Sequence, residues 1–320
     1  MRDRVDLSIL VPVCNEVDNV HELYLRIAKA LQALGGPAEI LFVDDGSTDG
    51  TFAVLELLHR RDPRVRVLQL RRNYGKAGAY AVGFRAARGP IIVTMDGDLQ
   101  DDPDELPKFL RTLAEGADVV TGWKVQGKGP WHRALPSRVF NWVLRRLTGL
   151  PFHDFNCPFK AYRREVAQEL DLYGELYRYI LVLVHRLGHR IAEVPIANYP
   201  RRAGVSKYGT GRLVHAFLDL LTVLFLTRFS ARPLHVLGGV SLALLGLGGA
   251  VALGLTAAHF VGYVWLGLPE WEIRTRPLLL LGVLLILAGL QVLSIGLVAE
   301  LLVRGRPEAR EAYAVRRRLP

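Results

Sequence analysis

The sequence predicts an α/β protein in which a mostly parallel sheet is followed by interfacial helices and two transmembrane helices. Two observations carry this prediction. Up to about Val125, short apolar stretches alternate with amphipathic ones, which is typical of a parallel sheet covered by helices on both faces. Near the C-terminus, two apolar stretches each exceed the ~20 residues that are needed to cross a bilayer.

The individual elements follow from the period of the apolar residues. Strands are expected at Ser8 to Val13, Glu39 to Val43, Val65 to Leu70, Pro90 to Met95 and Asp118 to Thr121. Helices are expected at Asp18 to Leu34, Thr51 to Arg60, Ala77 to Ala87 and Glu105 to Ala114. In such a sheet, ligands bind at the carboxyl ends of the strands.

The composition agrees with a globular domain joined to a membrane segment. Half of the 320 residues are hydrophobic, and the mean hydropathy is +0.19. The formal net charge is +10, but no long basic run with interleaved aromatic residues precedes the C-terminal tail. This argues against a nucleic-acid partner and leaves anionic lipid or a phosphorylated substrate. Two cysteines provide no disulfide framework.

Three polar clusters directly follow predicted strands, and we expect them to meet at one edge of the sheet. They are Asn15 with Glu16, Asp44 with Asp45, and Asp96 with Asp98. An Asp-Gly-Asp sequence can turn both carboxylates toward one hard cation, and oxygen ligands favour Mg²⁺ or Mn²⁺ over zinc. Because aspartate is common in ordinary turns, it is the coincidence of the three clusters that indicates a site.

The acidic run continues beyond this cluster. Asp101 to Glu105 are expected to cap and begin the next helix, whose N-terminus favours negative charge.

Five motifs, met in order along the chain, carry a resemblance to a known family. They are VPVCNE (Val11 to Glu16), VDDGSTDGT (Val43 to Thr51), RRNYGKAGA (Arg71 to Ala79), DGDLQDDPDELP (Asp96 to Pro107) and RRAGVSKYG (Arg201 to Gly209). Together they resemble the inverting family 2 glycosyltransferases. More narrowly, they resemble the polyprenyl-phosphate sugar transferases, a group that includes dolichol-phosphate mannose synthase and bactoprenol glucosyltransferases.

This resemblance implies a GT-A fold, which is a Rossmann-like domain, and assigns roles to residues on the donor side. The residues expected to bind the donor nucleotide are Pro12, Glu16, Asp44, Asp45, Lys76 and Asp96. Asp96, Asp98 and Gln100 are expected to bind Mg²⁺ or Mn²⁺ together with the donor diphosphate. For Lys76, a structural role in a strand-to-helix turn is nearly as well supported.

On the acceptor side, the same resemblance points to an acidic residue and to basic ones. Asp154 is expected to orient or deprotonate the acceptor, and Asp98 to share in catalysis through the metal. Arg201 and Lys207 are expected to hold the acceptor phosphate, with Arg133 and Arg138 as weaker candidates. The segment that carries Arg133 and Arg138 is either an ordinary surface helix or an interfacial one.

Four parts of the chain are expected. Residues 1–210 form the catalytic domain, residues 211–232 an interfacial helix, residues 233–303 two transmembrane helices, and residues 304–320 a basic tail. Arg228 and Arg232 precede the first apolar stretch, and further arginines follow the second from Arg304 onward. The positive-inside rule therefore predicts a multi-pass protein of the inner membrane with its catalytic domain on the cytoplasmic side.

The expected function is the transfer of a single sugar from UDP-glucose, another UDP-hexose or GDP-mannose to polyprenyl phosphate, with inversion, for cell-envelope glycosylation. A homo-oligomer is compatible with the sequence. Two alternatives remain open. One is a processive polysaccharide synthase, although the chain has no QxxRW motif. The other is a non-catalytic membrane scaffold that binds sugar lipids.

Overall fold

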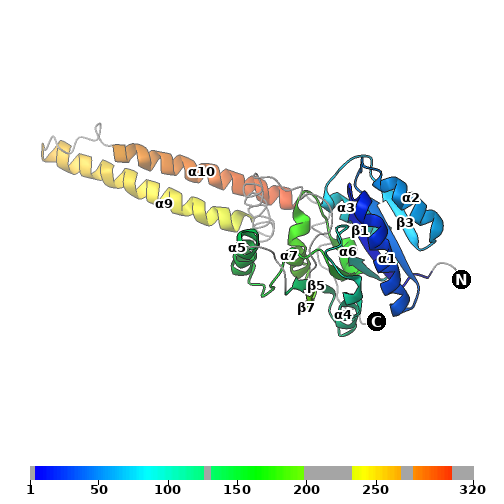
Figure 1. Cartoon of the computed structure of the whole chain (residues 1–320). Coiled ribbons are helices and arrows are strands. Elements are labelled where there is room, and N and C mark those ends of the chain that lie inside the picture. The colour runs from blue at the N-terminus through cyan, green and yellow to red at the C-terminus, as the bar shows by residue number, and fades with distance from the viewer. Residues whose placement is uncertain (1–3, 126–130, 198–232, 268–276, 305–320) are drawn as a thin grey trace, which may run out of the picture. The chain divides into compact units, whose positions relative to one another are not determined.

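The computed structural model describes residues 4–125, 131–197, 233–267 and 277–304 (Figure 1). The chain divides into two compact units, with the boundary between residues 223 and 224. The first unit contains a sheet with helices, and the second contains two long helices.

The N-terminal half of the first unit follows the predicted alternation. Its elements are β1 (Leu7–Val13), α1 (Val17–Leu34), β2 (Ala38–Asp44), α2 (Thr51–Arg61), β3 (Val65–Gln69), α3 (Lys76–Ala86), β4 (Ile91–Thr94), the 3₁₀ turn η1 (Pro103–Glu105), α4 (Leu106–Ala114) and β5 (Val119–Lys124). Each predicted strand and helix up to this point is confirmed, with ends that differ by at most three residues.

In the second half of this unit, the helix expected around Arg133 and Arg138 is present as α5 (Trp131–Thr148). The other elements have no counterpart among the sequence predictions. They are β6 (Lys160–Arg163), α6 (Arg164–Glu169), the 3₁₀ turn η2 (Leu176–Tyr179), α7 (Ile180–Arg186) and β7 (Ile191–Ile196).

The strands form one sheet of seven strands in the order β3-β2-β1-β4-β6-β5-β7. β1 pairs in parallel with β2 and with β4, and β5 pairs in parallel with β7. Only β6 is antiparallel to its neighbours among these described strands. The predicted mostly parallel sheet is therefore confirmed. Since β6 runs the opposite way, it begins at the edge where the other six strands end.

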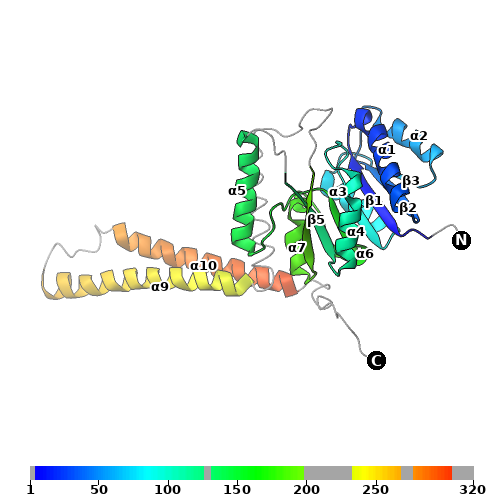
Figure 2. The same ribbon diagram turned by 60° about the horizontal axis from the view of Figure 1, so that its bottom comes forward.

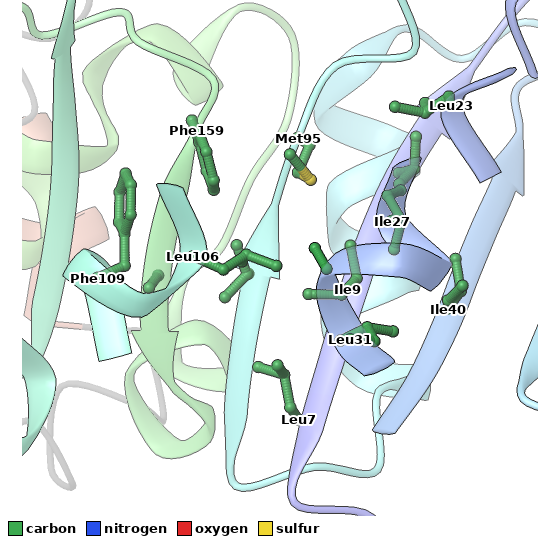
Figure 3. Packing of buried hydrophobic residues seen from close by; sticks show 14 of the residues in the cluster. Leu7, Ile9, Leu23, Ile27, Leu31, Ile40, Met95, Leu106, Phe109 and Phe159 are labelled. Carbon is green, nitrogen blue, oxygen red and sulfur yellow. The ribbon is translucent and has the colours of Figure 1, made fainter. Parts of the chain in front are cut away.

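Apolar side chains cover both faces of the sheet. On one face Ile9 of β1 packs in a buried cluster with Ile27 of α1, and Phe109 of α4 stacks on Phe159 with ring centroids 4.3 Å apart (Figure 3). On the other face α3 lies close against β1, because a Cβ at Gly83 would come within 2.3 Å of Leu10. Figure 2 shows the helices of this unit flanking the sheet.

The second unit consists of α9 (Pro233–His259), which continues into a π-helical turn, η4 (Phe260–Trp265), and α10 (Pro277–Arg304). The two helices lie side by side in Figures 1 and 2. Glycines allow their close approach, since a Cβ at Gly248 would lie 2.6 Å from the carbonyl oxygen of Gly282. The Ser241 hydroxyl also donates a hydrogen bond of 2.8 Å to the carbonyl of Gly289.

The spans Leu234–Gly262 and Pro277–Leu301, of 29 and 25 residues, are long and apolar enough to cross a membrane. The expected pair of long apolar helices is therefore present. Their surfaces carry exposed leucines, among them Leu242 and Leu253, which are 70% and 72% exposed. In the membrane, such side chains would face lipid instead of water.

One buried carboxylate ties the beginnings of several strands together. Glu39 of β2, 3% exposed, accepts hydrogen bonds from the Ser8 hydroxyl at 2.6 Å, the Arg88 backbone N–H at 2.7 Å and the Arg66 guanidinium at 2.8 Å. Burial raises the pKa of Glu39, but these donors outweigh it and hold the pKa below its ordinary value.

This predicts an acid-dependent contribution to stability. Because the folded-state pKa of Glu39 is depressed, its stabilisation is complete above the unfolded-state pKa of about 4.3 and is lost as the pH falls through the folded-state value. We expect Glu39→Gln to lower the melting temperature at pH 7, and the difference from wild type to shrink below about pH 4. Thermal unfolding of the full chain in detergent at several pH values measures this.

Glu56→Gln is the matched control, because Glu56 pairs with Arg60 on an exposed helix surface and should change the melting temperature little at any pH. A Glu39→Gln deficit that stayed constant from pH 7 to pH 3 would contradict the prediction.

Candidate active site

A pocket opens at the edge of the sheet where the parallel strands end. Its walls come from the end of β1, the turn after β2, the start of α3 and the turn after β4. The lining residues are Pro12, Val13, Cys14, Glu16, Asp45, Asn73, Gly75, Lys76, Ala79, Asp96, Gly97 and Asp98. The three polar clusters predicted from the sequence are thus brought to one place.

The turns after β1 and β2 interlock. Asn15 adopts a left-handed backbone conformation, with φ of 54°. Its side-chain oxygen accepts the Thr48 backbone N–H at 2.8 Å, and its own N–H donates to the Ser47 hydroxyl at 2.9 Å. The next residue, Glu16, donates its N–H to the Thr51 hydroxyl at 2.9 Å. The backbone beneath the pocket is therefore held by hydrogen bonds between two segments far apart in sequence.

The two adjacent aspartates after β2 have different positions. Asp45 lines the pocket and accepts the backbone N–H groups of Tyr74 and Gly75 at 2.7 and 2.9 Å. Asp44 is fully buried and is not among the lining residues; it accepts the Ser47 N–H at 3.1 Å and the Gln69 side-chain amide at 3.3 Å. Asp45 is thus placed to meet a ligand, whereas Asp44 shapes the turn that carries it.

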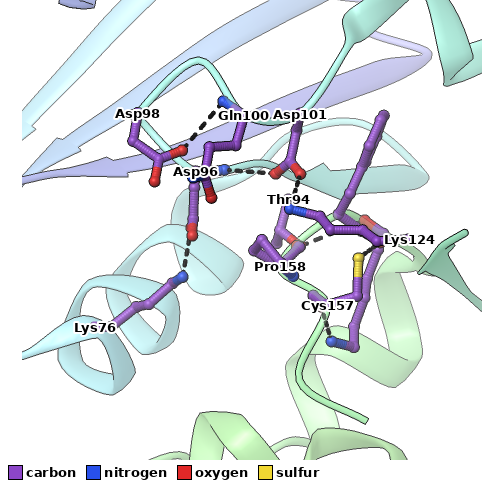
Figure 4. A network of polar contacts seen from close by, with 11 residues as sticks. Lys76, Thr94, Asp96, Asp98, Gln100, Asp101, Lys124, Cys157 and Pro158 are labelled. Atoms are coloured by element: carbon purple, nitrogen blue, oxygen red, sulfur yellow. Dashed lines mark hydrogen bonds and ion pairs between the residues drawn. The ribbon is translucent and has the colours of Figure 1, made fainter. Parts of the chain in front are cut away.

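The turn after β4 brings two carboxylates to the pocket. Asp96 and Asp98 both line it, and Gly97 between them packs so closely that a Cβ there would lie 3.0 Å from Val13. Leu99 has a left-handed φ of 63°, and the Gln100 N–H then donates to the Asp98 carboxylate at 3.2 Å (Figure 4). A tight turn with two carboxylates facing one pocket fits a hard divalent cation.

A cation from the protein already faces this turn. The Lys76 ammonium forms an ion pair with Asp96, and it lies 5.6 Å from the ring centroids of both Tyr80 and Tyr177. Burial lowers the pKa of Lys76, but the charge and hydrogen bond of Asp96, together with the nearby Tyr80 and Tyr177, outweigh that effect and hold the pKa well above its ordinary value. Lys76 is therefore a fixed positive charge in the wall of the pocket.

Asp101 differs from the sequence prediction. It does not begin the helix; the cap of the following turn is Asp102, whose carboxylate accepts the Asp104 N–H at 3.0 Å. Asp101 is buried, accepts the Asp96 N–H at 3.2 Å and forms an ion pair of 2.9 Å with Lys124 at the end of β5 (Figure 4). The prediction was wrong because the partner that draws Asp101 into the interior lies on another strand.

Cys157 lies beside this ion pair. Burial raises the pKa of its thiol to about 12, so the group is a packing residue and not a nucleophile at neutral pH. Cys14, in contrast, lines the pocket, where the Asn73 side-chain amide contacts its sulfur at 3.3 Å.

The remaining predicted residues are not among those lining the pocket. Asp154, 7% exposed, lies on the loop that leads into β6 and so stands at the same edge of the sheet. The Gln100 side chain is not part of the lining either. Arg133 and Arg138 belong to α5, but their side chains lie outside the described residues, as do Arg201 and Lys207 entirely.

Comparison with known proteins connects this site to a reaction. The model of glycosyl transferase family 2 matches residues 8–171. The chain belongs to this family. It is 37% identical over 319 residues to the dodecaprenyl-phosphate galacturonate synthase of Rhizobium johnstonii, covering 98% of this chain and 92% of the relative. It is 34% identical over 308 residues to the undecaprenyl-phosphate 4-deoxy-4-formamido-L-arabinose transferase of Edwardsiella ictaluri, covering 94% and 91%.

Solved structures support the fold. Glucosyl-3-phosphoglycerate synthase from Mycobacterium tuberculosis, in complex with Mn²⁺, UDP and phosphoglyceric acid, has a TM-score of 0.54 at 21% identity and covers 69% of this chain and 78% of its own. Mannosyl-3-phosphoglycerate synthase from Rubrobacter xylanophilus has a TM-score of 0.54 at 20% identity and covers 69% and 73%. The first unit therefore has the predicted GT-A fold. The named relatives show that this family 2 protein is a glycosyltransferase.

Several pocket residues were not predicted as site residues. They are Val13, Cys14, Asn73, Gly75, Ala79 and Gly97. Asn73 and Gly75 lie inside the motif RRNYGKAGA, but the family resemblance assigns a role there only to the charged Lys76. The signal for Gly75 was present, since a glycine before a helix often serves a backbone contact, here the hydrogen bond to Asp45.

Gly46 provides a test of the interlocked backbone. A Cβ there would lie 2.6 Å from the carbonyl carbon of Arg72 and 2.7 Å from the Asn73 nitrogen, and φ is +70°. Because backbone atoms cannot yield as a side chain can, we expect Gly46→Ala to displace the Arg71–Gly75 segment from Asp45. It should speed hydrogen exchange of the Tyr74 and Gly75 N–H groups at least about tenfold, because strain of about 1–3 kcal/mol or more weakens their hydrogen bonds to Asp45. Hydrogen–deuterium exchange of the full chain measures this.

Gly36→Ala is the matched control, with a similar φ of +86° and nothing within 4 Å of the added Cβ. It carries the conformational strain without the clash, so it should leave hydrogen exchange of the Tyr74 and Gly75 N–H groups unchanged. Equal effects of the two substitutions would show that the clash at Gly46 has no consequence for the pocket.

Proposed function

We propose that this protein transfers one sugar from a nucleotide sugar to a polyprenyl phosphate, with inversion at the anomeric carbon. The observation that carries the proposal is one pocket lined both by Asp45, from the turn after β2, and by Asp96 and Asp98, from the turn after β4. This set of acceptors suits a nucleoside together with a cation-bound diphosphate. The names of the relatives, which are polyprenyl-phosphate sugar transferases, support the acceptor class.

On the donor side, Pro12, Glu16 and Asp45 would contact the nucleoside, with Asp44 supporting the turn. A uridine nucleotide is the favoured donor, because the neighbouring glucosyl-3-phosphoglycerate synthase structure contains UDP with Mn²⁺. The sugars of the relatives, galacturonate and 4-deoxy-4-formamido-L-arabinose, are the first to try beside glucose, other hexoses and mannose.

Asp96, Asp98 and Gln100 would hold Mg²⁺ or Mn²⁺. When bound there, the cation would neutralise the charge that develops on the departing nucleoside diphosphate. Asp96 is oriented by Asp101 through its backbone N–H, and Lys76 places a second positive charge beside it. The protein would thus supply a prearranged site for the leaving group instead of reorganising during the reaction.

On the acceptor side, Asp154 would orient the lipid phosphate. A phosphate monoester has a second pKa of about 6, so its oxygen is already ionised at neutral pH and needs little help from a base. Arg201 and Lys207, with Arg133 and Arg138 as further candidates, would neutralise the phosphate. Attack on the face opposite the diphosphate gives inversion in one displacement, so an α-linked donor yields a β-linked product.

The membrane helices complete the proposal. With α9 and α10 spanning the inner membrane, the arginines that flank the two spans away from their connecting loop support a catalytic domain at the cytoplasmic face. Residues 1–210 would form that domain, residues 211–232 an interfacial helix, and residues 304–320 a basic tail at the headgroups.

The test uses full-length protein in detergent with undecaprenyl phosphate and a panel of UDP- and GDP-sugars, with lipid products identified by mass spectrometry. We expect Mg²⁺- or Mn²⁺-dependent formation of a lipid phosphate carrying one sugar. EDTA should abolish it, and Asp98→Asn should lower kcat/KM at least about 100-fold because transition-state charge is left unneutralised.

Asp104→Asn is the matched control, the same substitution at an exposed position of the same acidic run, and should retain wild-type activity. Products with several sugars would identify a processive synthase. Full activity of Asp98→Asn, or in the presence of EDTA, would refute the assigned metal site.

A further inference from the structure

Glu193 of β7 gathers the backbone that carries Asp154. Its Oε1 accepts the N–H of His153 at 2.9 Å and the N–H of Asp154 at 3.0 Å. Its Oε2 lies 2.7 Å from the His153 Nδ1 and 3.2 Å from the His153 N–H. One carboxylate thus holds two consecutive backbone N–H groups and the adjoining imidazole, and its side chain is only 12% exposed.

The sheet places this carboxylate. In the pairing of β5 with β7, Glu193 stands opposite Thr121. Thr121 lies two residues before Trp123 on β5. Trp123 stacks on the His153 ring, with centroids 4.0 Å apart and planes 14° apart. The imidazole is therefore held on one face by the indole and along its edge by Glu193. Two strands fix the position of a loop that belongs to neither of them.

The far side of the Asp154 backbone is also anchored. The Phe155 N–H donates to the buried Asn141 side chain of α5 at 3.4 Å, and the Phe155 ring is fully buried. The Asn156 N–H donates to the Asp154 carboxylate at 3.3 Å. With one neighbour of Asp154 tied to α5 and the other to β7, the direction of its carboxylate depends on these contacts.

We propose that Glu193 is a positioning residue for the acceptor, acting through Asp154. The inference deepens the proposed function and rests on its assignment of Asp154 to the lipid phosphate. Glu193 is not among the residues that line the donor pocket, so it should affect the orientation of the acceptor and not the binding of the nucleotide. The sequence offered no sign of this role, because Glu193 lies about forty residues from Asp154 in a short strand.

A carboxylate suits this position because its partners, the His153 and Asp154 N–H groups and the His153 imidazole, can all donate a hydrogen bond. Glutamine at position 193 would retain one oxygen for the two backbone N–H groups, and its amide would face the imidazole, which can change tautomer to accept. Alanine would remove the acceptor of the His153 and Asp154 N–H groups. Glutamine therefore weakens the contact between residue 193 and the Asp154 loop, and alanine removes it.

The experiment measures steady-state kinetics of the full-length enzyme for Glu193→Ala and Glu193→Gln, with Glu169→Ala as control. Glu169 also pairs with a histidine, His189 at 2.8 Å, but at the opposite edge of the sheet. We expect Glu193→Ala to lower kcat about 10- to 100-fold, as for a misplaced reacting group, with UDP affinity unchanged. Glu193→Gln should recover most of the activity, and Glu169→Ala should behave as wild type.

A double-mutant cycle with Asp154→Asn separates positioning from general destabilisation. If Glu193 acts through Asp154, adding Glu193→Ala to Asp154→Asn should lower kcat less than about twofold further. Hydrogen exchange of the peptide around residues 153–154 should accelerate in Glu193→Ala, whereas the peptides of β1 and β4 should not change.

The outcomes distinguish the two levels of inference. Wild-type activity of Asp154→Asn would remove the proposed role of Asp154, and with it the premise for Glu193. A strong loss in Asp154→Asn beside an active Glu193→Ala would overturn the positioning role alone. So would additive losses in the double variant, or a fall in UDP affinity that matched the fall in kcat.

Discussion

Parallel pairing of β1 with β2 on one side and β4 on the other is the constraint on which the site depends. Strands that run the same way end at the same edge, so the residues after Val13, Asp44 and Thr94 must converge. β6 adds the complementary condition, because an antiparallel strand inserted in the sheet begins where the others end. The donor pocket and the Asp154 loop are both consequences of strand direction.

Three carboxylates in this part of the domain accept hydrogen bonds from backbone N–H groups of other chain segments or turns. Asp45 accepts two from the Arg71–Gly75 segment, Asp101 accepts one from Asp96, and Glu193 accepts two from the Asp154 loop. A carboxylate can accept several hydrogen bonds at once, so it can join chain segments that have no side chains in common. The acidic residues therefore arrange the loops as well as offering ligands.

Charge at the edge is balanced locally. The buried Asp101 is paired with Lys124, and Asp96 with Lys76, so the acidic turn does not stand as an isolated set of negative charges. Removing one member of such a pair leaves the other uncompensated in a site of low polarity. This explains how a chain of net charge +10 can concentrate aspartates at one turn without losing stability there.

The sequence by itself determined the elements up to Lys124, the two long apolar helices and the acidic turn, because apolar periodicity and strand-end polarity are local properties. The resemblance of five motifs determined the family. Only the tertiary structure decided that Asp44 is buried while Asp45 lines the pocket, that Asp101 pairs with Lys124, and that Glu193 holds the Asp154 loop. These contacts join residues on different strands, and the order of strands in a sheet is set by packing of the whole domain. No local pattern records which distant donor a carboxylate will meet.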